Sequence, residues 1–181
     1  SSDILAEKEV RIALQHATNK QNISDGIFYG LEKPADTLFA STVPYCDIDL
    51  VPYEYDLTLA GQILDEAGWK MGSGNIREKE GKQLNIDLLY NSDSVTEKSI
   101  AEYLQSEYQT IGVALNIHGE EEQSYRDNMK AGNFDMVFNI CWGTPYDPQS
   151  SLAAMRAPVY GDYAAQLGLD DKAEIDAAIT E

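Results

Sequence analysis

The second half of the chain alternates short apolar runs with helical patterns, and this alternation constrains the fold more than any other feature. Residues 84–90, 113–117 and 136–141 are apolar runs of strand length, and helical patterns over 95–111 and 124–131 separate them. Ser94 and Glu97 form a capping-box pattern at the start of the first of these helices. Strand–helix–strand–helix–strand at this spacing predicts parallel pairing with right-handed crossovers. We therefore expect an α/β fold: one lobe with a small, mainly parallel sheet flanked by helices.

The rest of the chain is predicted to be helical, with two irregular segments. Residues 31–55 contain three prolines and no clean periodicity, which predicts a long irregular connection of a kind that often has a function. The polar, glycine-containing residues 71–82 predict a loop with a tight turn. Further helices are predicted over residues 3–18, 20–28, 56–67, 150–155 and 172–179.

The charge balance excludes some partners. Thirteen Lys and Arg stand against 31 Asp and Glu, a formal net charge of −18, and such a surface repels nucleic acid and anionic membranes. The sequence contains no apolar run long enough to span a bilayer. The 11 tyrosines favour a binding surface, although half-buried surface tyrosines would give the same count.

An aromatic loop follows the third apolar run. Glycine and two prolines between Trp142 and Pro148 force the chain to turn, so Trp142 and Tyr146 are delivered to the carboxyl end of a strand, where ligands bind in open α/β sheets. The two rings could equally cap and cover the core. Downstream, Arg156 could clamp a ligand carboxylate in bidentate fashion, or pair with Asp147 or Asp162.

Catalytic and metal-binding patterns find little support. His16 and His118 have no nearby nucleophile in a strained elbow, and neither a P-loop nor a GxGxxG pattern occurs. Cys46 and Cys141 do not form a CxxC pair, which argues against zinc and leaves open whether the two pair with each other. We predict no catalytic residues, no protein metal ligands and no cofactor.

A series of short segments in a fixed order carries a family resemblance. Residues 60–69 fit the pattern A-x-x-L-L-x-E-A-G-W, with Ile63 at the first Leu position. Ile111-Gly112-Val113, residues 132–135 and residues 142–148 follow in order. In this arrangement nearly the whole chain resembles the family 5 extracellular solute-binding proteins that serve peptide and nickel ABC importers.

Within that family, the stretch from Trp142 to Gln166 is most similar to the nickel-binding members. These take up nickel as a complex with a small multicarboxylate chelator. The resemblance implies a ligand-binding set of Trp142, Thr144, Tyr146, Arg156 and Tyr160. The nickel-binding relatives carry a metal-ligating histidine at the position of Tyr160, and a phenol with a pKa near 10 is a poor nickel ligand. Direct nickel ligation by this position is therefore not expected, and three ligands stay open: a chelate held only through its organic part, another metallophore, or a peptide.

The resemblance also implies a place for the chain in a larger protein. Such proteins are roughly two to three times this length and close two lobes on the ligand by a hinge. We expect residues 1–181 to be a single lobe of the C-terminal type, truncated at both ends, which binds ligand weakly by itself. The implied location is extracytoplasmic, either in the periplasm or lipid-anchored at the outer face of the cytoplasmic membrane, and the implied partners are the solute and the membrane subunits of an ABC importer.

Three alternatives remain open at this stage. In the same class, the chain could belong to a dipeptide- or oligopeptide-binding protein of an ABC importer. In another class, it could be a hydrolase or transferase that uses His118 and Asp135 near the strand ends. In a third, the Trp142 loop could contact another protein and bind no solute.

Overall fold

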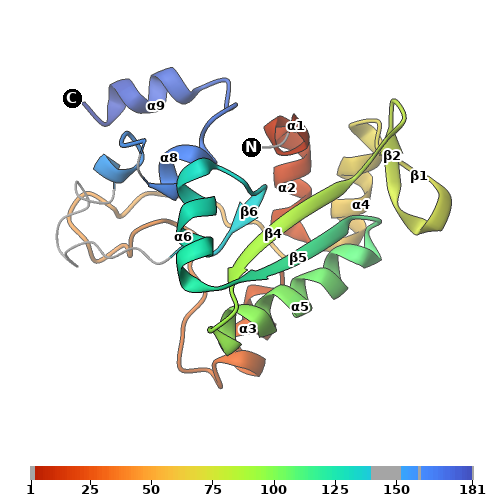
Figure 1. Cartoon of the computed structure of the whole chain (residues 1–181), viewed down its shortest axis with the longest axis horizontal. Coiled ribbons are helices and arrows are strands. Elements are labelled where there is room, and N and C mark those ends of the chain that lie inside the picture. The colour runs from red at the N-terminus through yellow and green to blue at the C-terminus, as the bar shows by residue number, and fades with distance from the viewer. Residues whose placement is uncertain (1–2, 140–151, 159, 181) are drawn as a thin grey trace.

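The computed structural model describes residues 3–139, 152–158 and 160–180 (Figure 1). The helices are α1 Asp3–Ala6, α2 Lys8–His16, α3 Lys20–Ile27, α4 Leu57–Glu66, α5 Val95–Thr110, α6 Glu122–Ala131, α8 Gly161–Ala165 and α9 Lys172–Ala178, with a 3-10 turn η1 at Ser73–Asn75. The strands are β1 Lys70–Met71, β2 Arg77–Lys79, β3 Lys82–Gln83, β4 Asn85–Asn91, β5 Ala114–Glu120 and β6 Met136–Val137. No helix in the described part is long and apolar enough to cross a membrane.

The predicted parallel sheet is confirmed, with β4 at its centre. The strand order is β5-β4-β6, and both neighbours run parallel to β4. The register runs from Asn85 opposite Ala114 to Asn91 opposite Glu120 on one side, and places Leu88 opposite Met136 on the other. Parallel strands need long crossovers, and α5 and α6 supply them. The carboxyl ends of all three strands therefore meet at one edge of the sheet.

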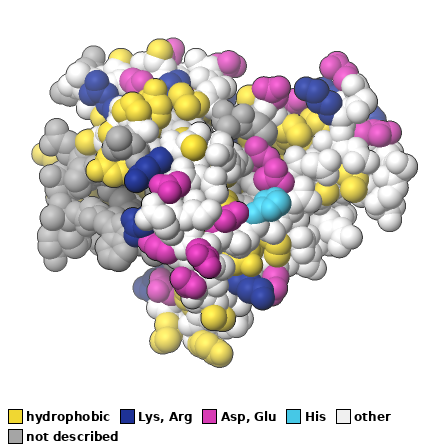
Figure 2. Space-filling model, in the orientation of Figure 1, with side chains coloured by type: hydrophobic (Ala, Val, Ile, Leu, Met, Phe, Trp, Pro, Cys, Tyr) yellow, Lys and Arg dark blue, Asp and Glu magenta, His cyan; other side chains and the backbone are white. Residues whose placement is uncertain are grey.

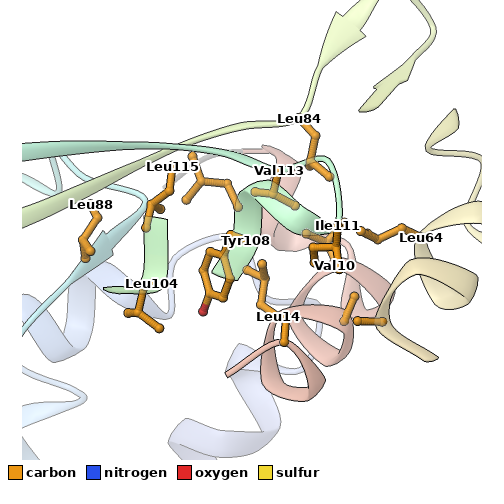
Figure 3. Close-up of a cluster of buried hydrophobic side chains, with 14 of the residues drawn as sticks. Val10, Leu14, Leu64, Leu84, Leu88, Leu104, Tyr108, Ile111, Val113 and Leu115 are labelled. Carbon is orange, nitrogen blue, oxygen red and sulfur yellow. The ribbon is translucent and has the colours of Figure 1, made fainter. Parts of the chain in front are cut away.

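The main core lies between one face of this sheet and helices α2, α4 and α5 (Figure 3). Alternation along β4 sends Ile86 and Leu88 to this face, and Leu115 joins them from β5. Leu64 of α4 is fully buried against the same cluster. Each such side chain stabilises the fold by roughly 1.5–3 kcal/mol relative to leaving it exposed. This core fixes the sheet on which the candidate site is built.

The opposite face is only partly covered. Leu89 points to that side and packs with Tyr125 of α6, Phe134 and Ala164 of α8 in a second, smaller cluster. Further along the same face, Asp87 and His118 remain exposed. Figure 2 shows acidic side chains spread over this view of the molecule, as the net charge of −18 implies.

The predicted loop over residues 71–82 is wrong for the most part, because residues between Lys70 and Gln83 form a three-stranded antiparallel sheet, β1-β2-β3. The tight turn predicted within it is confirmed between β2 and β3, where Glu80 and Gly81 have φ of 52° and 79°. Its strands have two or three residues each, too short for a visible period of two. A buried arginine holds the sheet to the core. Arg77, 5% exposed, donates from its guanidinium to the backbone oxygens of Ile111 (2.6 Å), Trp69 (2.6 Å) and Gly61 (3.1 Å), and to Asp65 (2.9 Å). Such long-range contacts leave no periodic signal in the sequence.

Several predicted boundaries also need correction. Residues 3–18 form two helices, because Glu7 has extended backbone and its carboxylate accepts from the Trp69 indole (3.2 Å) and Lys79 (2.8 Å). α6 begins at Glu122, two residues earlier than predicted. Pairing of β6 ends at Val137, and the last two residues of the predicted strand lie outside the described residues. The predicted helix over 150–155 is seen at 152–154, and α8 was not predicted.

Candidate functional site

The carboxyl edge of the parallel sheet is held together by Asn91, the last residue of β4. Its side-chain amide donates to Glu122 at the start of α6 (2.5 Å), and its backbone N–H donates to the Glu97 carboxylate in α5 (2.8 Å). Its side-chain oxygen accepts the N–H of Asp93 (2.9 Å), which turns the chain into α5. One asparagine thus joins a strand end to the first turns of two helices.

This arrangement refines the predicted capping box. Ser94 caps α5 by accepting the N–H of Glu97 (3.2 Å), as predicted. Glu97, however, bonds the backbone of Asn91 and not that of Ser94. Sequence reasoning missed Asn91, although an Asn directly after an apolar strand is a turn signal that could have pointed to it.

The end of β6 is fixed by contacts from α6 and α8. The Tyr125 hydroxyl donates to the backbone oxygen of Phe138. Asn139 donates from its side chain to Asp162 in α8 (2.9 Å). These two bonds orient the chain at the point where the predicted aromatic loop begins, and they bring the start of α8 to the same edge.

The three loop residues of the predicted site, Trp142, Thr144 and Tyr146, lie outside the described residues, so their role stays a prediction. The other two are described. Tyr160 directly precedes α8, two residues before Asp162, and its side chain is 52% exposed. The bond from Asn139 to Asp162 therefore places Tyr160 near the carboxyl end of β6.

Arg156 is exposed, and within the described ranges its guanidinium takes part in no ion pair. Of its two candidate partners, Asp162 accepts from Asn139 instead, and Asp147 lies outside the described residues. A guanidinium in this state can form a bidentate pair with a carboxylate brought by a ligand.

The residues considered for catalysis have structural partners. His118 Nε2 lies 3.1 Å from Asp87 Oδ1 on the exposed sheet face, and Asp135 accepts the backbone N–H of Asp87 (2.9 Å). Partial burial raises the pKa of Asp87, but hydrogen bonds from Asn116 and His118 and the His118 charge outweigh it, so the pKa lies below its ordinary value. Asp87 is thus an anion that orients the imidazole.

In the described part of the chain no three His, Cys, Asp or Glu side chains gather as a metal site. Cys46 is a free, half-buried thiol, and Cys141 lies outside the described residues.

A cavity of about 220 Å³ lies away from this edge. It is lined by Leu5, Arg11, Asp135 and Leu169 among others, at the amino end of β6. Arg11 donates there to the backbone oxygens of Leu5 (2.8 Å) and Ala6 (2.7 Å), which end α1. The cavity therefore lies between residues near the start of the chain and the segment after α8, at the opposite end of the sheet from the candidate site.

The titration of Tyr125 gives a test of the β6 anchor. Burial raises the pKa of Tyr125 to about 12, and the charges of Glu97 and Glu122 act in the same direction. Because the folded state holds this proton more tightly than the unfolded chain, the stabilisation is complete below pH 10.0 and is lost as pH rises towards 12.

We expect Tyr125→Phe to lower the free energy of unfolding by about 1 kcal/mol at neutral pH. The variant should also show a weaker decline of that free energy between pH 10.0 and 12. Thermal unfolding at both ends of the window measures this. Tyr45→Phe, at a fully exposed position, is the control, and equal declines in both variants would contradict the assignment.

Comparison with known proteins places the chain in a family. The model of "Bacterial extracellular solute-binding proteins, family 5 Middle" matches residues 1–162. The nickel-binding periplasmic protein of Escherichia coli K12 is 43% identical over 176 residues, covering 97% of this chain and 34% of that protein. The crystal structure of NikA from Brucella suis in complex with Fe(III)-EDTA superimposes with a TM-score of 0.90 at 46% identity, covering 96% of this chain and 35% of that one. The oligopeptide-binding protein OppA of Lactococcus lactis subsp. cremoris is 28% identical, covering 98% of this chain and 31% of that protein.

The chain thus spans about a third of the length of these relatives. The family match covers most of its residues and agrees with the resemblance seen in the sequence. Its fold is that of the periplasmic solute-binding proteins of this group. The chain belongs to the bacterial extracellular solute-binding proteins of family 5.

Proposed function

We propose that this chain is one lobe of a solute-binding protein that captures nickel, as a chelate with a small organic carboxylate, for an ABC importer. The likeness to the nickel-binding protein of E. coli carries the proposal, and the likeness to NikA in complex with Fe(III)-EDTA, a metal held by a polycarboxylate, supports it. The protein would act outside the cytoplasmic membrane and deliver the solute to the importer's membrane subunits. Family members bind solutes for transport and are not enzymes.

The chemistry of the described residues favours recognition of the chelator. Arg156 is exposed and has no ion-pair partner among the described residues, so it is available to a chelator carboxylate. Tyr160 provides a phenol, which suits hydrogen bonding better than nickel ligation. The aromatic side chains of Trp142 and Tyr146 would supply stacking and apolar contact.

The proposal includes a second lobe. The relatives are about three times as long as this chain, which leaves room for a further lobe in the intact protein. A wall from the other lobe would then complete the enclosure of the ligand.

Arg156→Met in the intact protein tests the proposal. Because a hydrogen bond to a charged group is worth about 1.5–3 kcal/mol, we expect the affinity for a nickel–polycarboxylate complex to fall by about 10- to 100-fold. Tryptophan fluorescence titration measures it. Arg126→Met is the matched control, since Arg126 is exposed and its one ion pair among the described residues joins it to its helix neighbour Glu122. Equal affinities of the two variants would remove Arg156 from the site.

Peptide binding is the second candidate, favoured by the OppA match and by the tyrosine at position 160. The same titration with a panel of dipeptides and tripeptides separates the two functions. If peptides quench the fluorescence of the intact protein and nickel chelates do not, the peptide function is correct.

A further inference from the structure

The long irregular segment after α3 is fixed to the lobe at its start. Lys20 of α3 forms an ion pair with Asp36 (2.7 Å) and donates to the backbone oxygen of Ala35 (3.2 Å). Ser24, also in α3, donates from its hydroxyl to the backbone oxygen of Glu32. The segment therefore leaves the lobe from a defined position.

The same segment is fixed again where it returns. His16 Nδ1 lies 2.7 Å from the backbone oxygen of Glu54, and the His16 ring meets that of Tyr53 edge to face at 5.3 Å. Tyr55 donates to the Glu107 carboxylate (2.5 Å), which raises the pKa of Tyr55 to about 12. Asp56 donates its N–H to the backbone oxygen of His16 (2.9 Å) and then caps α4.

Between these two anchors, residues 37–52 form an arm that touches neither core cluster with an apolar side chain. Among the described residues its hydrogen bonds are local: Thr37 to Phe39, then Val43 to Ala40, Cys46 to Val43, Ile48 to Cys46 and Leu50 to Ile48. Phe39 and Val43 are half-buried. Five of its large apolar side chains are nevertheless exposed: Tyr45 103%, Val51 86%, Ile48 59%, Leu38 58% and Leu50 49%. An apolar run of this kind in water marks a contact surface.

We propose that the arm is a docking surface for the remaining part of the same polypeptide. The relatives are about three times as long as this chain, so a large partner surface is available within one molecule. Asp47 and Asp49 alternate with Ile48 and Leu50, so burial of the apolar pair leaves two carboxylates at the rim. The matching surface is apolar and bordered by Lys or Arg.

A second copy of the chain fits this surface poorly. Two symmetric arms would bring Asp47 and Asp49 against their own copies, in a chain that already carries a net charge of −18. The remaining part of the polypeptide has no such constraint. The inference rests on the two-lobed organisation proposed above, but not on the identity of the solute.

Hydrogen exchange and unfolding of the intact protein test the inference. We expect amides of residues 43–51 to exchange at least about tenfold more slowly than their local hydrogen bonds alone would allow. The double variant Ile48→Ser, Leu50→Ser should lower the thermal midpoint by several degrees. Val95→Ser is the matched control, because Val95 is 78% exposed at the start of α5, and it should leave the midpoint unchanged.

Fast exchange of the arm with an unchanged midpoint would overturn the inference. So would protection that grows with protein concentration together with a dimeric mass, or protection that requires the importer's membrane subunits. Titration of the unsubstituted intact protein with the nickel chelate keeps the two proposals apart. A protected arm in a protein that binds no chelate would sink the solute assignment and leave the docking surface standing.

Discussion

Arg77→Met is expected to lower the free energy of unfolding of this chain by about 3–5 kcal/mol. The methionine fills a similar volume but donates no hydrogen bond. The backbone oxygens of Ile111, Trp69 and Gly61, which now accept from the guanidinium, would lose that donor. A buried acceptor without a partner costs about 1–3 kcal/mol, so several together account for the expected loss.

The same arginine affects the acid side of the stability curve. Its hydrogen bond to Asp65 holds the pKa of that carboxyl below the ordinary value of 3.8. A lowered pKa in the folded state means that this stabilisation is present above pH 3.8 and is lost as the pH falls further. Arg77→Met should therefore lower the free energy of unfolding at neutral pH, and it should also weaken the decline of that free energy as the pH falls below 3.8.

Urea unfolding across a pH series measures both effects. Arg126→Met is the control, because its pair with Glu122 is exposed and such pairs contribute at most about 1 kcal/mol. Indistinguishable midpoints for the two variants would mean that Arg77 does not hold the antiparallel sheet to the core.

Trp69→Ala is expected to cost about 3–5 kcal/mol, the usual range for removing a buried tryptophan. Trp69 is 2% exposed within the main core, its indole N–H donates to Glu7, and the Lys79 ammonium lies 5.7 Å from its ring centroid. The substitution removes all three contacts and leaves a cavity between α4, the antiparallel sheet and the break after α1.

Circular dichroism during chemical unfolding of the variant provides the measurement. Tyr45→Ala removes an aromatic ring that is fully exposed in this chain and should change the midpoint little. A loss below about 1 kcal/mol for Trp69→Ala would show that the ring is not packed as described.

The packing around Trp69 explains why the pattern over residues 60–69 could be detected in the sequence. In residues 60–69, Ala60 and Leu64 are fully buried, Gly68 adopts φ +90° and Trp69 fills the core. The pattern thus reflects core packing and a helix end, and it gives no information about a binding site. The parallel sheet was equally predictable, because β4 and its crossovers are long and periodic.

Other parts of the structure depend on contacts far apart in the sequence. The helix break at Glu7 and the antiparallel sheet require Trp69, Lys79 and Arg77 to reach distant elements, and no local pattern encodes that. At the candidate site, the sequence indicated the strand edge and named Arg156 as a candidate for either a ligand carboxylate or an ion pair within the chain. The Asn91 network and the bond from Asn139 to Asp162 emerge only from the tertiary arrangement.

The position of the metal in crystals of the intact protein tests the central claim most directly. Crystals soaked with a nickel–polycarboxylate complex and measured at the nickel absorption edge give that position without prior assumptions. We predict a metal peak facing the carboxyl ends of β4 and β6, with a chelator carboxylate on the Arg156 guanidinium and the Tyr160 hydroxyl outside the coordination sphere. Peptide density in the cleft, or a metal peak far from Arg156, would contradict the account.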